Sequence, residues 1–399
     1  MLPLIASIAL AVPAVWLGLL LWYRRPLIAF WREPVFRTPV LIFESDDWGP
    51  APPEHAEMLA AIAGLLAEFS DRTGRHPVMT LAVVLAIPEP GQEPAASLSE
   101  LTLAEPQFRP IVEAMQAGGR AGVFQLQLHG RSHYWRETLL VARESDTAVA
   151  RWLAGPDTWH TEALPPELQS RWEPRIAGKP FRIDDATASA AAARDAHLFR
   201  ECLGTEATIA VPNRFDWNPA VESGWAEAGV RTIVTPGRYF GHRGQFGPPN
   251  SFKLITNGMR SESVRYVVRD QYFEPLKGHT VGDGLRALAV NTALSRPTLL
   301  ETHRANFLDV ATRDRSLSLM RELLAEALAR YPELRFLSTA ELVDAIDERR
   351  PDLIGQSLRG RVAAWCARIR TQHRFWKLAR LSGLALIVIG LERLVSDRG

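Results

Sequence analysis

The chain has 399 residues, of which 47% are hydrophobic, and its 46 basic residues nearly balance its 45 acidic ones. This length is enough for one large domain or two modest ones, and the near-zero net charge is not typical of a nucleic-acid-binding protein. The two cysteines, Cys202 and Cys366, are too few for a disulfide scaffold or a cysteine-rich zinc module. We therefore expect a globular protein with no nucleic-acid partner.

The first predicted element is an apolar helix at the N-terminus. Residues 2–23 contain no charged side chain, and a helix of about 22 residues would extend about 33 Å, enough to cross a hydrocarbon core of about 30 Å. A cleaved signal peptide fits less well, because no basic segment precedes the run and no clear cleavage site follows it. We expect a transmembrane helix within residues 1–25. Arginines follow the run and none precedes it, which favours a membrane protein with its main domain in the cytoplasm.

Strands and helices alternate between residues 38 and 350. Short apolar runs predict strands at 40–43, 79–86, 123–128, 208–211, 232–234, 298–302 and 335–337. Apolar residues at helical spacing predict helices at 56–68 and 316–331. This alternation indicates parallel strands joined by crossover helices, in a barrel or a doubly wound sheet. The less regular segments 134–180 and 236–280 follow strands, so we expect them at the end of the sheet where long loops shape functional sites.

The last predicted region, residues 351–399, alternates basic and apolar residues. Cations and aromatic residues are interleaved up to residue 380, and an apolar run follows at 381–391. This run of about 11 residues is too short to span a bilayer. We expect a helix at the membrane interface, with its basic side toward anionic lipid headgroups. The alternative is an amphipathic helix that packs against the protein's own core.

Polar residues follow several of the predicted strands. The first group, Asp46 and Asp47, lies in the sequence Glu-Ser-Asp-Asp-Trp-Gly-Pro. Adjacent side chains of a strand point to opposite faces, so both carboxylates reach one site only where the chain turns, and Gly49-Pro50 predicts such a turn. A helix cap or a solvated turn is the alternative role for this pair.

Three further groups follow later strands. His129 and His133, together with a carboxylate, would hold a divalent cation and leave positions for water and substrate. Arg214 is predicted to orient a carboxylate by a bidentate contact, and His303 ends a late strand. Surface histidines, a surface salt bridge and a structural histidine are the respective alternatives. The carboxyl ends of successive parallel strands lie at the same end of a sheet. We therefore expect a metal triad, a base and an acid at one site.

The order of these motifs resembles the polysaccharide deacetylase superfamily, carbohydrate esterase family four, over residues 40–346. The resemblance implies a distorted (β/α)7-type barrel in which Asp47, His129 and His133 bind the metal ion. It also implies that Asp46 is the general base and His303 the general acid. Where the family reads Thr-Phe-Asp-Asp-Gly, this chain reads Glu-Ser-Asp-Asp-Trp-Gly.

The resemblance implies a hydrolase of carbon–nitrogen bonds other than peptide bonds. We expect removal of an N-acetyl group from an amino sugar, in a glycan or a lipid-linked saccharide, with membrane lipids as the other partner. The expected cofactor is a divalent ion, with Zn²⁺ favoured, which polarises the carbonyl and lowers the pKa of its water. Trp48, Trp135 and Asn306 are expected to contact the substrate, the tryptophans by stacking on sugar rings.

Two other functions remain open. Two histidines and a carboxylate also bind iron in non-haem Fe(II) oxygenases. In those enzymes the carboxylate lies close to one histidine in sequence, the other histidine is distant, and the fold is a β-sandwich. The chain could also be an inactive, membrane-tethered glycan-binding or scaffold protein, because a fold does not establish an activity.

Overall fold

One sheet of parallel strands organises the structure, a computed structural model that describes residues 2–91, 97–240, 252–308 and 310–396. Its nine strands are β1 Val40–Trp48, β2 Met79–Val83, β5 Phe124–Leu128, β8 Ile209–Ala210, β9 Thr232–Thr235, β12 Arg265–Val268, β13 Gln271–Tyr272, β14 Thr298–His303 and β15 Arg335–Phe336. They lie in the order β12-β9-β8-β5-β2-β1-β14-β13, and β15 pairs with the start of β1. Every predicted strand belongs to this sheet, so the prediction of a parallel α/β fold is confirmed.

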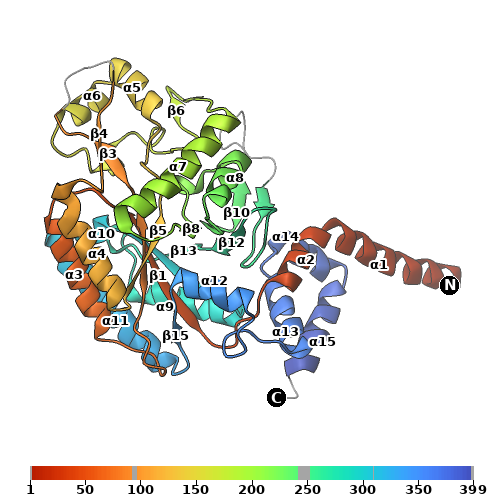
Figure 1. Cartoon of the computed structure of the whole chain (residues 1–399). Helices are drawn as coiled ribbons and strands as arrows, with labels where there is room; N and C mark the ends of the chain where they lie inside the picture. Colours follow the sequence, from red (N-terminus) through yellow and green to blue (C-terminus); the bar gives the residue numbers. More distant parts are fainter. Residues whose placement is uncertain (1, 92–96, 241–251, 309, 397–399) are drawn as a thin grey trace.

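The two edges of the sheet come from one short segment of the chain. β12 pairs with β9, β13 pairs with β14, and only Arg269 and Asp270 separate β12 from β13. Because a residue spans at most about 3.5 Å, this link keeps the two edges close together. The sheet therefore curls into a half-barrel (Figure 1). The barrel-like fold agrees with the prediction, although the described sheet has nine strands and β12 does not pair with β13.

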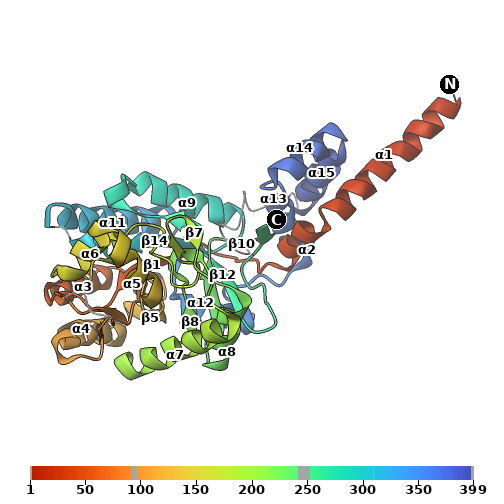
Figure 2. The same ribbon diagram turned by 90° about the horizontal axis from the view of Figure 1, so that it is seen from above.

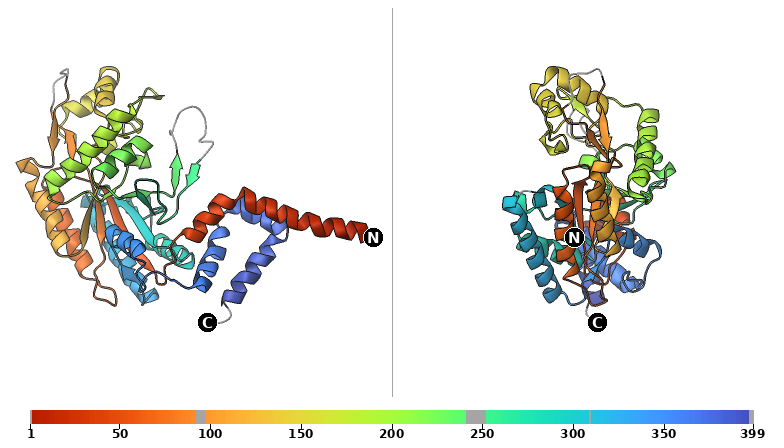
Figure 3. Two further views of the ribbon diagram at one scale, coloured as in Figure 1. Left: turned by 45° about the vertical axis from the view of Figure 1, so that its right-hand side comes forward. Right: turned by 60° about the vertical axis from the view of Figure 1, so that its left-hand side comes forward.

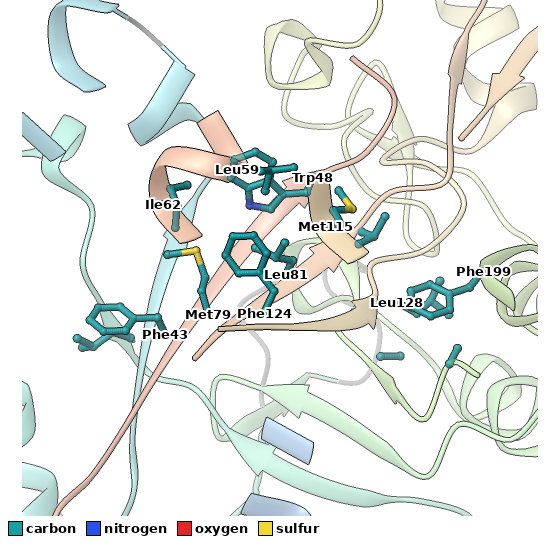
Figure 4. Packing of buried hydrophobic residues seen from close by; sticks show 14 of the residues in the cluster. Phe43, Trp48, Leu59, Ile62, Met79, Leu81, Met115, Phe124, Leu128 and Phe199 are labelled. Carbon is teal, nitrogen blue, oxygen red and sulfur yellow. The ribbon is translucent and has the colours of Figure 1, made fainter. Parts of the chain in front are cut away.

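Helices pack on the sheet and connect its strands. Those of the α/β body are α3 Glu54–Ala67, α4 Arg109–Arg120, α7 Asp185–Leu203, α8 Pro219–Glu227, α9 Val281–Ala293, α10 Ala305–Leu308, α11 Val310–Arg330 and α12 Thr339–Asp347, with 3-10 turns at Pro106–Phe108, Asn213–Phe215 and Pro275–Lys277. The predicted helices at 56–68 and 316–331 are α3 and α11. In the core, Phe43 and Leu81 from the strands meet Leu59 and Ile62 of α3 and Met115 of α4 (Figure 4). Burying these apolar side chains stabilises the fold.

Shorter elements interrupt the alternation. They are α5 Arg136–Ser145, α6 Thr147–Ala154, a 3-10 turn at Thr161–Ala163, and the strand pairs β3 Ala86–Pro88 with β4 Glu100–Thr102, β6 Arg175–Ile176 with β7 Lys179–Pro180, and β10 Arg238–Phe240 with β11 Phe252–Leu254. Figure 1 shows α5, α6, β3, β4 and β6 together at one end of the sheet. The segment 134–180 is thus mainly helical and irregular, as predicted, apart from the short pair β6 and β7. The segment 236–280 contains two strands of the main sheet that were not predicted.

A helical module lies beside the α/β body. It consists of α1 Leu2–Trp22, α2 Arg24–Arg32, α13 Leu358–Ile369, α14 His373–Leu381 and α15 Leu384–Ser396 (Figure 2, Figure 3). Its small core includes Phe30, Cys366, Phe375 and Val388. The single interfacial helix predicted at 381–391 is instead the end of α14 and most of α15, because the chain turns at Gly383 with φ 80°. One face of α15 packs within the module, as the alternative reading proposed.

None of the described helices is both long enough and apolar enough to cross a membrane. The transmembrane helix predicted within residues 1–25 is therefore not supported, although residues 2–22 do form the helix α1. Part of the surface of α1 contacts the protein itself. Nε1 of Trp16 donates to the carbonyl oxygen of Ser382 at 2.9 Å. Directly after α1, the ring of Tyr23 packs edge-on against Phe375 with centroids 5.3 Å apart.

The buried guanidinium of Arg368 joins the module to the α/β body. It donates to the carbonyl oxygens of Glu33 and Pro34, which follow α2, and of Leu294 and Ser295, which follow α9, at 2.7–2.9 Å. Burial lowers the pKa of Arg368 to about 10. The carbonyl oxygen of Ser295 also accepts from the backbone N–H of Phe36. Removal of the Arg368 side chain takes a donor away from all four carbonyl groups and leaves its buried surroundings with fewer hydrogen bonds.

We expect Arg368→Met to lower the free energy of unfolding by about 3 kcal/mol or more. Chemical denaturation followed by circular dichroism measures the change. Arg361 is exposed on the same helix, so Arg361→Met is the matched control and should change stability by less than about 0.5 kcal/mol. Equal effects of the two substitutions would contradict the proposed joining role of Arg368.

Candidate metal centre

The end of β1 has the local geometry that brings two neighbouring carboxylates to one site. Asp47 has a φ of 74°, and the register with β2 shifts between Ser45 and Trp48. A residue in this left-handed region breaks the strand's alternation of side chains between the two faces of the sheet. Aspartate tolerates this conformation better than most residues do. Asp46 is the register partner of His303 on β14. Both carboxylates therefore lie at the carboxyl end of the parallel strands, where the later polar residues of the site also lie.

Asp47, His129 and His133 form a compact buried triad. Oδ1 of Asp47 lies 3.3 Å from Nε2 of His129 and 2.8 Å from Nε2 of His133. One candidate ligand atom from each residue lies within 4.8 Å of the others. Burial alone would raise the pKa of Asp47, but the charge of His133 and the close approach of both imidazoles to the carboxylate outweigh it, so the pKa lies well below its ordinary value. The carboxylate is therefore ionised.

The second nitrogen of each imidazole is held by the protein. Nδ1 of His129 donates to the carbonyl oxygen of Val211 at 2.8 Å, and Nδ1 of His133 lies 3.2 Å from the hydroxyl oxygen of Thr161. This leaves both Nε2 atoms facing Asp47. Nε2 of His133 is buried and has no hydrogen bond of normal geometry within the described residues, despite its approach to Asp47. Histidine ligands of metal ions typically bind the metal through one ring nitrogen while the protein holds the other.

The donor set fits a divalent metal ion. Two imidazole nitrogens and one carboxylate oxygen suit Zn²⁺ and related transition-metal ions, and three protein ligands leave a position for water or substrate. These residues are thus able to hold the ion that the sequence motifs led us to expect, and its identity stays a prediction.

Asp46 is held by a buried arginine, Arg269. Nη1 and Nη2 of Arg269 donate to Oδ1 and Oδ2 of Asp46 at 2.7 and 2.6 Å, in a bidentate contact. Nη1 also donates to Oε2 of Glu44 at 3.0 Å, and Nε lies 3.1 Å from Oε2 of Glu301. The side chain of Arg269 is 0% exposed, so these contacts are shielded from solvent.

The pKa values of the three carboxylates around Arg269 are shifted in different directions. Burial raises the pKa of Asp46, but the charge and hydrogen bonds of Arg269 outweigh it and the pKa is lowered. Burial raises the pKa of Glu301 to about 7, although the charge of Arg269 opposes it. Burial likewise raises the pKa of Glu44. Asp46 is therefore the member of this group whose pKa lies below its ordinary value, which favours its ionised form.

His303 is held by Glu274. Its Nδ1 donates to Oε1 of Glu274, and Nδ2 of Asn306 donates to Oε2 of the same carboxylate. Burial favours the neutral imidazole, but the hydrogen bond of Glu274 and the charges of Asp47 and Asp46 outweigh it and raise the pKa of His303 to about 10. His303 is therefore protonated at neutral pH, while Asp46 is ionised.

The three predicted substrate contacts are all buried in the structure. Trp48 is 0% exposed, lies in the main core, and donates from Nε1 to the hydroxyl oxygen of Ser45 at 2.8 Å (Figure 4). Trp135 is 8% exposed in the same core and packs against Trp172. Asn306 is 0% exposed, and both polar atoms of its side-chain amide form hydrogen bonds within the protein. Its Nδ2 donates to Glu274, and its Oδ1 accepts from the backbone N–H of Leu276 at 3.0 Å. These side chains shape the protein interior.

Arg214 was predicted to orient a carboxylate of the site, and the structure gives that contact to Arg269. The side chain of Arg214 is 41% exposed, donates to the carbonyl oxygen of Pro166, and lies 3.9 Å from Asp216. Its sequence neighbours reach the site instead. Nδ2 of Asn213 donates to the carbonyl oxygen of His129 at 2.8 Å, and Phe215 lies under the guanidinium of Arg269.

Sequence reasoning also missed Glu274 and Arg269. Both lie in the segment 236–280, which was expected to be irregular. The apolar run Tyr-Val-Val at 266–268 was the available signal for a strand, and an arginine directly after that strand follows the same pattern as Asp46 and His303.

We expect Arg269→Met to lower the free energy of unfolding by about 3–5 kcal/mol, because it leaves buried carboxylates without a countercharge. Arg214→Met is the matched control and should cost less than about 1 kcal/mol, since that side chain is 41% exposed. Urea denaturation of both variants measures the difference. A similar small loss for both would show that the network around Arg269 is not needed for stability.

We expect Glu274→Gln to lower the pKa of His303 by more than about one unit, because it removes a charge and weakens a hydrogen bond. NMR titration of the His303 ring in the metal-free protein measures this, with Glu162→Gln as a control that should leave the pKa unchanged. Because the pKa of about 10 exceeds the ordinary 6.5, protonation of His303 stabilises the fold below pH 6.5, and this contribution is lost as the pH rises through 10. An unchanged pKa in Glu274→Gln would contradict the assignment.

Comparisons with known proteins give only distant matches, all of them to solved structures. No family model and no curated protein matches the chain. A polysaccharide deacetylase from Mycobacterium smegmatis, described as putative, matches with 14% identity and a TM-score of 0.41 over 80% of this chain and 94% of that one. A family 4 acetyl xylan esterase from Clostridium thermocellum, solved with cobalt, matches with 11% identity and a TM-score of 0.37 over 76% and 90% of the two chains.

A third match has a different activity. It is a 4-alpha-glucanotransferase from Thermococcus litoralis, with 10% identity and a TM-score of 0.40 over 77% of this chain and 40% of that one. A family 4 carbohydrate esterase from Streptomyces lividans, in complex with acetate, also matches, with 10% identity and a TM-score of 0.33 over 76% of this chain and 92% of that one.

Proposed function

We propose that the protein is a divergent polysaccharide deacetylase, a metal-dependent hydrolase that removes an N-acetyl group from an amino sugar. The observation that carries this proposal is the grouping of the triad of Asp47, His129 and His133 with two further groups in opposite charge states. Asp46, beside the triad, is ionised, and His303, its register partner, is protonated. Such a pair is suited to acid–base chemistry at one carbonyl group.

The triad would hold a divalent ion, which when bound polarises the acetyl carbonyl and lowers the pKa of its water. Asp46 accepts the proton of the attacking water, because Arg269 keeps its carboxylate ionised and fixed in orientation. His303 donates a proton to the departing amine, which is a poor leaving group in its anionic form. Glu274 fixes the ring of His303 and favours the protonated form that this step requires.

The substrate class rests on the resemblance of the motifs to carbohydrate esterase family four. A glycan or lipid-linked saccharide that carries N-acetylated amino sugars would present the amide to this site. Zn²⁺ is the proposed ion, because two nitrogens and one oxygen are a common donor set for catalytic zinc.

We expect the protein to bind one divalent ion per chain and to release acetate from N-acetylated oligosaccharides only with the ion bound. His133→Ala should weaken metal binding by at least about a hundredfold, since it removes a ligand outright. His197→Ala is the control, because His197 is exposed on α7. Elemental analysis and calorimetric titration with Zn²⁺ measure binding, and a coupled assay measures acetate.

Asp46→Asn separates binding from chemistry in the same assay. This variant should keep the ion and lose hydrolysis by at least about a hundredfold, because the amide no longer accepts the proton. Acetate release that persists after chelation of the metal would refute the proposed mechanism, and a wild-type rate in Asp46→Asn would refute the role of Asp46.

A further inference from the structure

Exposed apolar side chains are concentrated on the helical module. Fourteen of the 18 exposed large hydrophobic residues in the described structure lie in α1, α2 and α13–α15. They are Val12, Val15, Leu17, Leu20, Leu21, Trp22, Ile28, Leu358, Leu378, Leu381, Leu386, Ile387, Leu391 and Leu394. The much larger α/β body has the other four, Val141, Tyr272, Leu276 and Val290. Contiguous exposed apolar surface of this kind is a common sign of an interaction site.

Part of this surface is continuous across two segments that are far apart in the sequence. The hydrogen bond from Trp16 to the carbonyl oxygen of Ser382 places α1 against the turn between α14 and α15. Around this contact, Leu17 is 59% exposed, Leu381 76% and Leu386 74%. We call Leu17, Leu381 and Leu386 the junction surface. Figure 2 and Figure 3 show α1 extending away from the α/β body, so this body does not cover it.

The charges beside the junction surface are almost all positive. Arg24 and Arg25 follow α1, and Arg374, Lys377 and Arg380 are exposed on α14. Glu392 is the single acidic residue in the segments 11–32 and 358–395, and it pairs with Arg370. Apolar residues flanked by lysine and arginine with little acid are typical of helices that bind at the surface of anionic membranes.

We propose that the junction surface binds the interface of a membrane that contains anionic lipids. The leucines enter the boundary between headgroups and acyl chains, and the cations of α14 contact the lipid phosphates. A second copy of the chain is a poorer partner, because a symmetric contact would bring these cations against one another. The proposal concerns a binding surface outside the metal centre and does not depend on the proposed hydrolysis.

The test is flotation of the full-length protein with vesicles. One set contains phosphatidylcholine alone, and the other contains equal amounts of phosphatidylcholine and phosphatidylserine. We expect binding to the anionic vesicles, which Leu381→Glu with Leu386→Glu weakens by at least about tenfold. Val290→Glu is the control, because Val290 is 50% exposed on the α/β body; it should change binding by less than about twofold.

A second double variant keeps the test decisive if the glutamates disturb the fold, which circular dichroism would report. Lys377→Gln with Arg380→Gln should weaken binding to anionic vesicles and leave binding to neutral vesicles unchanged. Wild-type protein that floats with neither vesicle overturns the proposal, as does a loss of binding that is equal in the leucine variant and in Val290→Glu. Sedimentation of a dimer that the leucine variant abolishes, without vesicle binding, would identify a second copy as the occupant and overturn it as well.

Discussion

The buried guanidinium of Arg269 is the interaction on which both the sheet and the candidate site depend. Glu44, Asp46 and Glu301 are acidic residues of neighbouring strands inside the half-barrel, and burial disfavours their charged forms. Arg269 contacts all three from the link between the two edges of the sheet. The curl of the sheet therefore brings the countercharge to the carboxylates, and the carboxylates in turn hold the link in place.

This arrangement also separates the roles of two adjacent carboxylates. Asp46 is engaged by Arg269, whereas Asp47 faces two imidazoles, because the positive φ of Asp47 turns the chain between them. The contrast matters because neighbouring acids in the same environment would compete for one proton. Different partners hold both in the ionised form and leave His303, held by Glu274, as the protonated group.

Much of the fold could be predicted from the sequence, because strands buried on both faces appear as apolar runs such as Val-Leu-Ile-Phe at 40–43. The motifs at the ends of such strands predicted that Asp47, His129 and His133 would lie together, as they do. The position of Arg269 could not be derived in this way, because β12 and β13 are short and lie in a segment with little periodicity. Trp48 was misjudged because β1 continues through it into the core, where its indole is enclosed. The chemical roles of these residues stay predictions.

The helical module shows a different limit of sequence reasoning. Its apolar segments at the two ends of the chain were assigned separately, yet Trp16 and Ser382 are in contact. Long-range pairing of this kind depends on the shape of both partners, which local patterns do not contain. The exposed remainder of these helices is then the part of the surface left for other interactions.

X-ray absorption spectroscopy of the metal-loaded protein tests the central claim most directly. The account predicts one bound ion whose nearest shell contains two imidazole nitrogens and carboxylate oxygen at about 2.0–2.2 Å, with the imidazole signal reduced in a variant that lacks His129. A shell of oxygen atoms alone, or an imidazole signal unaffected by that variant, would contradict it.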